Sequence, residues 1–261
     1  GPAADAKQRQ LDGKVGELIY CIHKVGFNGT QNSYNKTMAQ QWQMPYSHLK
    51  AFCAHPFSVM RYFCGDIVAI QAFLDKPGVR KTAEDAMLSI NSIHCRFANG
   101  GVGYLISQRG DAMFGYGGWW SYEHCGAKST FAIENCVEKL HVWKPQVGGG
   151  MATPAPETTD YGVSDFGATF PNRIGAFLED ITNGVHPEAI RASGRDALAT
   201  LEYTFVAMKS YESGGELVIP CEYEELNCVE SVFSYDYICG EFLLARRDGK
   251  YGLIDMDGKI L

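Results

Sequence analysis

The chain has 261 residues, of which 46% are hydrophobic, 20% charged and 12% aromatic, and this composition excludes disordered, collagen-like and coiled-coil proteins. A net charge of −7 without any basic run argues against nucleic acid and anionic membranes as partners. The longest apolar stretches, such as residues 67–74, are much shorter than the roughly 20 residues of a membrane span. The sequence therefore predicts a soluble protein.

The nine cysteines are scattered along the chain, contain no C-x-x-C pair and lie mostly within apolar runs. An odd number at irregular spacing is typical of reduced core thiols rather than of a disulfide framework or a zinc site. We therefore expect no metal and, since no secretory signal peptide precedes the fold, a cytoplasmic protein. Gly1 and Pro2 resemble the remnant of a cleaved tag.

The first third of the chain combines a strand, a loop and a helix. Apolar and polar residues alternate over 12–24, which predicts a strand. Residues 26–46 are rich in Gly, Asn and Gln and fit neither periodicity, so we expect a long, functional loop there. A helical pattern begins at Ser47 and ends at Gly65.

The middle of the chain predicts a series of mostly antiparallel strands. The expected strands cover residues 66–74, 86–97, 102–109, 115–122, 128–134 and 137–143. Tight turns at Asn99-Gly100-Gly101 and at Asn135-Cys136 join two pairs of them. Residues 146–165 carry several Gly, Pro, Ser and Thr, which predicts a loop or linker.

Two helices, a strand and a tail complete the predicted fold. The first helix has an apolar stripe at Phe170, Ile174, Phe177, Leu178 and Ile181 and ends at Asn183-Gly184. The second begins at Ser193, with Asp196 in the capping-box position, and stops at Gly214-Gly215 before a strand at 217–219. We predict an α+β fold with one large, mostly antiparallel, open-faced sheet that carries helices on one face, followed by a short all-β tail.

Several common functional motifs are absent from the sequence. There is no G-x-G-x-x-G, no G-x-x-x-x-G-K-[ST], no G-x-S-x-G and no H-E-x-x-H. The glycine clusters near residues 100 and 117 lie in strand or hairpin settings, where they do not form a phosphate cradle. We therefore expect no cofactor site in this chain.

The order of the predicted elements and several local motifs over residues 12–220 carry a family resemblance. The motifs are Gly13-Lys14-Val15-Gly16-Glu17, the helix with His55 before Gly65-Asp66-Ile67, Phe97-Ala98-Asn99-Gly100, Gly126-Ala127-Lys128-Ser129-Thr130, and the helices at 170–184 and 193–213 with Val218-Ile219-Pro220. Together they resemble the C-terminal, substrate-binding half of the Gfo/Idh/MocA family of NAD(P)-dependent sugar and polyol oxidoreductases.

The resemblance implies that a second domain is needed for activity. In that family a Rossmann domain precedes this half and supplies the nucleotide site and the lysine of a Glu-Lys-Pro motif, and neither is present here. NAD or NADP would accordingly bind only if the chain were joined to such a domain. In that family, the face of the open sheet that carries no helices packs against another subunit, so the resemblance implies a homo-oligomer.

The resemblance also assigns a catalytic candidate. The family has a helix with an aspartate and, four residues later, a histidine, so that both side chains face the substrate. His55 matches the histidine, but Ala51 stands at the aspartate position, which puts proton transfer in doubt. A helix histidine satisfied by backbone groups is the alternative interpretation of His55.

Aromatic and polar residues around the expected cleft suit a sugar, because rings stack on its apolar face while polar groups bond its hydroxyls. Strand neighbours point to opposite faces, so only one of Trp119 and Trp120 can line a given pocket. Packing in the core is the alternative for the strand aromatics. The predicted substrate-binding residues are Tyr34, Asn35, Trp42, His55, Arg109, Trp120, Tyr122 and His124.

The tail over 221–261 departs from the usual ending of that family. Its segment Gly249-Lys250-Tyr251-Gly252-Leu253-Ile254-Asp255 resembles a WG-type β-repeat. A single repeat cannot bury a core alone, so we expect it to dock on the sheet or on a neighbour. A hairpin that covers a sheet edge is the other possibility.

The sequence therefore predicts a domain over 12–220 and a tail over 221–261. The predicted function is the substrate-binding and oligomerisation half of a nicotinamide-dependent oxidoreductase for a sugar, polyol or glycoside, not competent for hydride transfer alone. The alternative is a non-catalytic carbohydrate-binding or assembly module. An independent enzyme that uses His55, Glu123 or His124 has little support, because no nucleophile and base are recognisably spaced.

Overall fold

The computed structural model describes only part of the chain, and three predicted site residues, Tyr34, Asn35 and Trp42, lie outside the described residues. The described ranges are 1–27, 44–78, 81, 86–109, 115–145, 154–163, 165–220, 242–247 and 250–255. Contacts between residues divide the chain into two compact units, 1–220 and 221–261, which are described separately.

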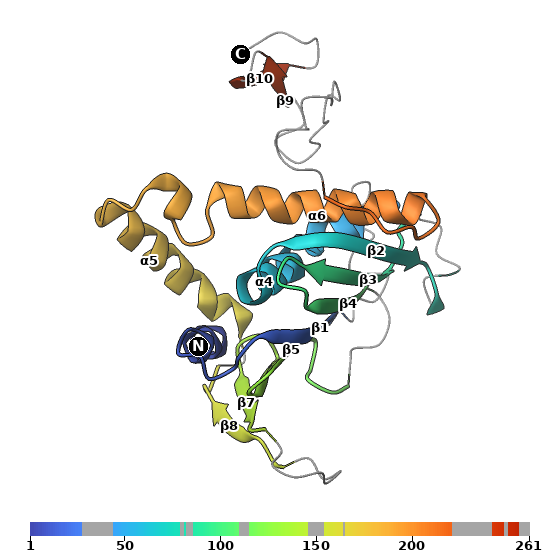
Figure 1. The fold of residues 1–261 in the computed structure, drawn as a ribbon. Helices are drawn as coiled ribbons and strands as arrows, with labels where there is room; N and C mark the ends of the chain where they lie inside the picture. Colours follow the sequence, from blue (N-terminus) through green and yellow to red (C-terminus); the bar gives the residue numbers. More distant parts are fainter. Residues whose placement is uncertain are drawn as a thin grey trace. The chain divides into compact units, whose positions relative to one another are not determined.

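An eight-stranded sheet forms the centre of the first unit (Figure 1). Its strands are β1 (Leu18–Phe27), β2 (Ile67–Asp75), β3 (Ile90–Phe97), β4 (Val102–Arg109), β5 (Trp120–Gly126), β6 (Thr130–Glu134), β7 (Lys139–Trp143) and β8 (Glu157–Asp160). They lie in the order β2-β3-β4-β1-β5-β6-β7-β8. Only β1 and β4 are parallel, and the other neighbours are antiparallel, which confirms the predicted α+β fold with a mostly antiparallel open sheet.

Several helices accompany the sheet (Figure 1). They are α1 (Pro2–Leu11), α3 (Ser47–Phe52), α4 (Ala54–Cys64), α5 (Thr169–Thr182) and α6 (Gly194–Glu212), with short 3-10 turns η3 (Phe166–Ala168) and η4 (Pro187–Ala189). Helix α4 packs on β1, α6 packs on β2 and on α4, and α1 contacts β6 and β7.

The two faces of the sheet differ because side chains alternate along each strand. On β1, Cys21, His23 and Val25 are fully buried beneath the helices. Their neighbours Ile22 and Lys24 point to the opposite face and stay partly exposed. The buried face carries the core and the open face remains available to solvent.

Helix α4 lies very close to the sheet because β4 has a glycine where the two meet. A Cβ atom at Gly103 would stand 2.8 Å from both Met60 Cε and Phe97 Cε2, and 3.0 Å from Cys21 Sγ. A larger side chain at this position would force Met60 of α4 and Phe97 of β3 to move. The position of α4 therefore depends on this glycine.

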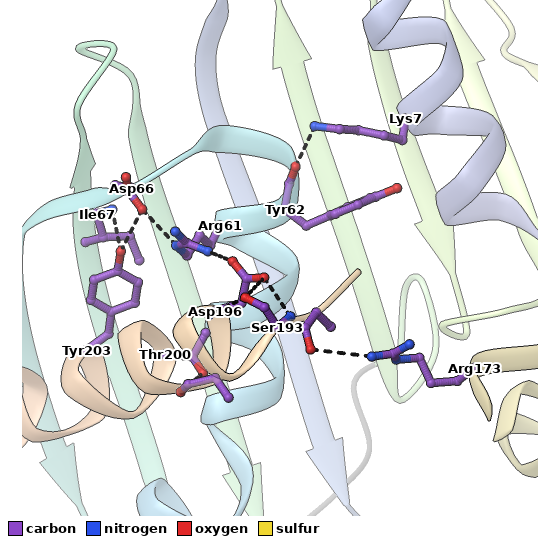
Figure 2. Close-up of polar contacts among 12 residues, drawn as sticks. Lys7, Arg61, Tyr62, Asp66, Ile67, Arg173, Ser193, Asp196, Thr200 and Tyr203 are labelled. Carbon is purple, nitrogen blue, oxygen red and sulfur yellow. Dashed lines mark hydrogen bonds and ion pairs between the residues drawn. The ribbon is translucent and has the colours of Figure 1, made fainter. Parts of the chain in front are cut away.

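A polar network joins α4 to α6 (Figure 2). Arg61 donates from Nε to Asp66 Oδ1 over 2.7 Å and forms an ion pair with Asp196. Asp196 also completes the predicted capping box with Ser193, which the structure confirms. The same arginine thus holds both the end of α4 and the start of α6.

The predicted elements in the sheet are largely confirmed, with corrections at their ends. Strand β1 begins at Leu18 rather than at residue 12 and continues to Phe27. Strand β5 was expected over 115–122 but covers Trp120–Gly126. Trp119 therefore precedes the strand, so the alternation argument that separated it from Trp120 is wrong.

Three further corrections concern short or terminal segments. Residues 146–165 were expected to be loop only, yet β8 pairs with β7 at the edge of the sheet. The expected strand 217–219 forms only one bridge, between Val218 and Ile70. Helix α1 was not predicted, because its sequence has few apolar residues and begins with Pro2, a residue suited to the first helical turn.

The described part of the second unit is a two-stranded antiparallel hairpin. Its strands are β9 (Phe242–Arg247) and β10 (Lys250–Asp255), with Leu244 opposite Leu253. This pairing agrees with the strands expected in the tail, and the WG-type assignment stays a prediction.

None of the helices in the described ranges is long and apolar enough to cross a membrane. These ranges also hold no group of three or more His, Cys, Asp or Glu side chains placed to bind a metal ion.

We expect the Gly103→Val substitution to lower the free energy of unfolding by about 1–3 kcal/mol, because its side chain overpacks the contact between α4 and the sheet. Urea unfolding measures this change. Gly175→Ala in α5 is the matched control, since a Cβ there meets no atom within 4 Å. Equal effects of the two substitutions would contradict the tight contact at Gly103.

Candidate functional site

An aromatic cluster surrounds the junction between α3 and α4. The ring of Phe52, the last residue of α3, lies 5.7 Å from that of His55 and 5.6 Å from that of Trp120 at the start of β5. On the other side of Trp120, Phe166 of η3 stacks at 6.3 Å with 19° between the ring planes. Trp119 also contacts Phe166, at 6.1 Å. We call this continuous row of rings the aromatic wall; its members are Phe52, His55, Trp119, Trp120 and Phe166.

His55 is an exposed member of this cluster, as is Phe166. It lies in the first turn of α4, and its imidazole has no hydrogen-bond partner among the described residues. The interpretation of His55 as a histidine satisfied by described backbone groups therefore has no support. Partial burial lowers the pKa of the ring, so it is neutral at pH 7 and can accept or donate a hydrogen bond. Ala51, one turn earlier, supplies no carboxylate beside it.

His23 lies beneath the aromatic wall on the buried face of β1. Its ring is 5.4 Å from the rings of both Trp120 and Tyr122, and the side chain is fully buried. Burial lowers its pKa from 6.5 to about 3, and the nearby Pro56 carbonyl only partly opposes this. Neither ring nitrogen makes a hydrogen bond of ordinary geometry. His23 is therefore a neutral, unsatisfied imidazole.

A second group of buried polar side chains lies on the other side of Phe52. The imidazole of His48 stacks on Phe52 at 6.0 Å, and its Nε2 is 2.7 Å from Ser107 Oγ on β4. Asn91 on β3 donates from Nδ2 to Cys53 Sγ over 3.6 Å. Burial lowers the pKa of His48 to about 3, and the neighbouring charge of Arg109 lowers it further.

Several atoms of this polar group have no partner. They are His48 Nδ1, Ser89 Oγ and Asn91 Oδ1, and their residues are at most 1% exposed. A buried polar atom without a hydrogen bond costs about 1–3 kcal/mol, so such atoms commonly bind a ligand or an ordered water. Asn91 is on β3, Ser89 directly precedes that strand and His48 is on α3. The buried Arg109 is close by, since its backbone amide donates to the Ser89 carbonyl over 2.9 Å.

The structure brings together three of the predicted site residues. His55, Trp120 and Arg109 all lie at the end of the sheet where β1 and β4 finish and β5 begins. His23, His48, Ser89, Asn91 and Ser107 were missed by the sequence analysis. The signal that could have found them is the occurrence of polar residues at inward-facing positions of otherwise apolar strands.

Tyr122 and His124 lie further along β5, inside the core. Tyr122 Oη is 3.2 Å from both Cys64 Sγ and His124 Nδ1, and the His124 ring stacks on Phe131 at 4.9 Å. Both residues are at most 1% exposed. Their predicted contact with a substrate stays a prediction, and their observed role is packing and hydrogen bonding within the core.

The open face of the sheet also has a hollow, of about 560 Å³, around β1, β5 and β6. Tyr20, Tyr116 and Trp143 line it, and Tyr20 Oη donates to Glu123 Oε1 over 3.0 Å. This hollow lies on the face opposite the one where His55 and the aromatic wall stand.

The starts of α3, α4 and α6 differ from the helix N-terminus that binds the pyrophosphate of a dinucleotide. Pyrophosphate binds at a helix N-terminus that follows a glycine-rich turn. Helices α3 and α4 follow Tyr46 and Cys53, without a glycine before either. In the first turn of α6 the Ser193 hydroxyl already bonds the Asp196 amide, and the Asp196 carboxylate would repel a phosphate.

Comparisons with known proteins show the fold. No family model and no curated protein matches the sequence. Among solved structures, a levoglucosan dehydrogenase in complex with NADH and levoglucosan matches with a TM-score of 0.68 at 17% identity, over 84% of this chain and 63% of its own.

Two other structures match in the same way. An NAD binding oxidoreductase from Klebsiella pneumoniae has a TM-score of 0.67 at 16% identity, over 85% of this chain and 64% of its own. A putative myo-inositol dehydrogenase from Sinorhizobium meliloti has a TM-score of 0.61 at 19% identity, over 84% and 62%. The chain thus spans less than two thirds of the length of these oxidoreductases and shares the fold of that part.

Two of the buried histidines, His23 and His48, predict a loss of stability in acid. Their pKa values are about 3 in the folded state and 6.5 when unfolded, so below pH 6.5 the unfolded chain binds protons that the folded chain does not. Stability is fully present above pH 6.5 and falls as the pH decreases. At pH 5 each histidine accounts for a loss of about 2 kcal/mol.

Urea unfolding at pH 7 and at pH 5 measures this effect. We expect His23→Phe to lose less stability between these two pH values than the unsubstituted chain does. The same loss in both proteins would contradict the neutral, buried state of His23.

Proposed function

We propose that this chain is the substrate-binding and oligomerisation half of a nicotinamide-dependent oxidoreductase that acts on a sugar, a polyol or a glycoside. The likeness to part of three oxidoreductases supports the proposal, since one is a levoglucosan dehydrogenase in complex with NADH and levoglucosan, one is an NAD binding oxidoreductase and one is a putative myo-inositol dehydrogenase. NAD or NADP would be bound by a Rossmann domain, not by this chain. Without that domain the chain would not transfer hydride.

The observation that carries the proposal is the meeting of an aromatic wall and unsatisfied polar groups at one end of the sheet. Phe52 and Trp120 present flat apolar surfaces, and His48 Nδ1 and Asn91 Oδ1 lack hydrogen-bond partners nearby. A sugar has apolar C–H faces and many hydroxyls, so it suits both kinds of surface.

In this proposal each predicted residue has a stated role. His55 binds a substrate hydroxyl through its neutral imidazole, and Trp120 packs against the sugar ring. Arg109 donates hydrogen bonds to further hydroxyls. The predicted contacts of Tyr34, Asn35, Trp42, Tyr122 and His124 are part of the same proposal.

We infer that the open face of the sheet joins copies of the chain in a homo-oligomer. Large apolar side chains exposed on the sheet support this, among them Phe73 and Val102, which are 55% and 53% exposed. A cytoplasmic location is also part of the proposal, supported by the four buried free thiols of Cys21, Cys53, Cys64 and Cys95. Residues 12–220 would form the substrate domain and 221–261 a WG-type tail.

A non-catalytic carbohydrate-binding or assembly module is the second candidate. Ala51 favours it, because the aspartate that would orient His55 or share its proton is missing. Such a module would bind the same ligands without catalysing a reaction on them. Assaying the complete gene product for sugar-dependent reduction of NAD or NADP separates the two candidates, since only the oxidoreductase gives a signal.

We expect the chain alone to bind levoglucosan, L-sorbose or myo-inositol and to bind neither NADH nor NADPH tightly. His55→Ala should weaken the binding of the preferred ligand about tenfold, the loss of one hydrogen bond of about 1.4 kcal/mol. Isothermal titration calorimetry measures both effects. Ser58→Ala, an exposed change one turn along α4, is the matched control. Failure of all three ligands to bind would count against a sugar site.

A further inference from the structure

Three polar side chains on neighbouring strands form a hydrogen-bonded series on the open face of the sheet. Thr158 Oγ1 on β8 lies 2.8 Å from His141 Nδ1 on β7, and His141 Nε2 lies 2.9 Å from Glu134 Oε2 on β6. A hydroxyl, an imidazole and a carboxylate in this order are the groups with which many enzymes make a hydroxyl nucleophilic. None of the three residues belongs to the candidate site at His55.

The register of the strands explains why these side chains meet. Thr158 lies directly opposite His141, and Ala132 lies opposite His141 on the other side. Glu134 is two residues from Ala132, so it is on the same face and diagonal to His141. Leu140, the neighbour of His141 that points to the other face, is fully buried. The series therefore stands on the open face.

The carboxylate of Glu134 fixes the proton on the imidazole. Its Oε2 accepts from His141 Nε2, while its Oε1 pairs with Lys139 Nζ at 3.4 Å, so both oxygens are held in place. In the neutral ring the proton then stays on Nε2, because only that nitrogen has an acceptor carboxylate beside it. The lone pair of Nδ1 is left to accept the proton of the Thr158 hydroxyl.

The backbone of Thr158 adds a donor for a negatively charged oxygen. The Tyr161 amide donates to the Glu138 carbonyl over 2.9 Å, which makes these two residues a hydrogen-bonded pair of the ladder. Such pairs alternate in antiparallel sheets, so Thr158 and His141 form a non-hydrogen-bonded pair whose amides point away from each other. Strand β8 is the edge strand beside β7 (Figure 1), and the Thr158 amide thus points outward at this edge. The amide of a nucleophile commonly stabilises the oxyanion in acyl transfer.

An aromatic surface lies beside the hydroxyl. The ring of Trp143, two residues along β7 from His141, is 5.9 Å from the imidazole. Trp143 is a diagonal neighbour of Thr158 on the same face, within reach of an aromatic side chain. It also lines the hollow of about 560 Å³ together with Tyr20 and Tyr116. This volume is within the usual range of about 300–1,000 Å³ for ligand sites, so the flat alcohol part of an ester can pack on Trp143 there.

Thr158 is accessible from solvent, since its side chain is exposed. The exposed apolar side chains that support the proposed homo-oligomer, Phe73 and Val102, are on β2 and β4, in the other half of the strand order. Contact between copies through those side chains does not require β8 to be covered.

We propose that Thr158, His141 and Glu134 form an esterase site, distinct from the site at His55, which hydrolyses carboxylic esters through an acyl group on Thr158. Thr158 and His141 are its catalytic residues, and Glu134 is a positioning residue. This activity goes beyond the proposed function.

The reaction has two halves. His141 Nδ1 takes the proton of Thr158 Oγ1 while this oxygen forms a bond to the ester carbonyl carbon. The bond from that carbon to the alcohol oxygen then breaks, and the alcohol leaves with the proton from Nδ1. In the second half, water gives a proton to the same nitrogen and attacks the acyl group. The acid leaves, and Thr158 Oγ1 regains its proton.

Reaction of the 261-residue chain with p-nitrophenyl acetate tests the proposal. We expect release of p-nitrophenolate and, after an acid quench, an acetyl group on Thr158, which peptide mass spectrometry locates. His141→Gln should lower the rate of Thr158 acetylation at least tenfold, since a positioned general base contributes about 10²–10⁴-fold. Thr158→Val should remove the label from this position.

Two substitutions on the same sheet are matched controls for this experiment. His94→Gln changes an exposed histidine of the open face, and Thr159→Val changes the other face of β8. Both should leave the acetylation of Thr158 unchanged.

Glu134→Gln tests the positioning residue. It should lower the rate of Thr158 acetylation about tenfold, because an amide does not stabilise the imidazolium that forms. Glu134→Asp keeps the carboxylate and should recover part of the rate. Urea unfolding of both variants separates this effect from a loss of stability.

Three results would overturn the proposal. They are acetylation of lysines without any acetyl group on Thr158, an equal rate of Thr158 acetylation in His141→Gln, and release of p-nitrophenolate no faster than in buffer alone. Sugar binding at His55 depends on other residues, so these results would leave the proposed function as it stands.

Discussion

The close contact between helix α4 and the sheet is the constraint on which the rest of the structure depends. Gly103 allows Met60 and Phe97 to fill the space where its side chain would be, so α4 lies directly on β1 and β4. The turn before α4 then brings Phe52 against Trp120, and with it His55 to the end of the sheet. Without this contact, Phe52 and His55 would not be held next to Trp120.

At the candidate site, several buried polar atoms lack the hydrogen bonds that such atoms usually make in proteins. Most such groups in proteins have hydrogen-bond partners. Further along β5, Tyr122 Oη and His124 Nδ1 are bonded to each other, and His124 Nε2 alone has no partner there. At the site end, His23, His48 and Asn91 keep unpaired atoms. Their concentration beneath a wall of rings is what distinguishes this end of the sheet as a place for a polar ligand.

Two surfaces of the first unit are left apolar by its own fold. The open face of the sheet carries large exposed side chains such as Phe73 and Val102, and α5 carries its stripe. Both are positioned by buried or hydrogen-bonded groups, the sheet by its core and α5 by the pair of Asp180 and Arg191. The described residues leave both surfaces exposed.

The sequence by itself determined the α+β class, most strands and the helices at α4, α5 and α6, because these elements have local signals: alternation, apolar stripes, Asn99-Gly100 and the capping box at Ser193. Resemblance singled out His55. The tertiary structure decided which polar residues meet. His48 and Ser107 are 59 positions apart, and only the register of β3 and β4 beneath α3 places them together. It also decided that Trp119 precedes β5 and that the described residues leave the apolar stripe of α5 exposed, because strand ends and burial depend on partners distant in the chain.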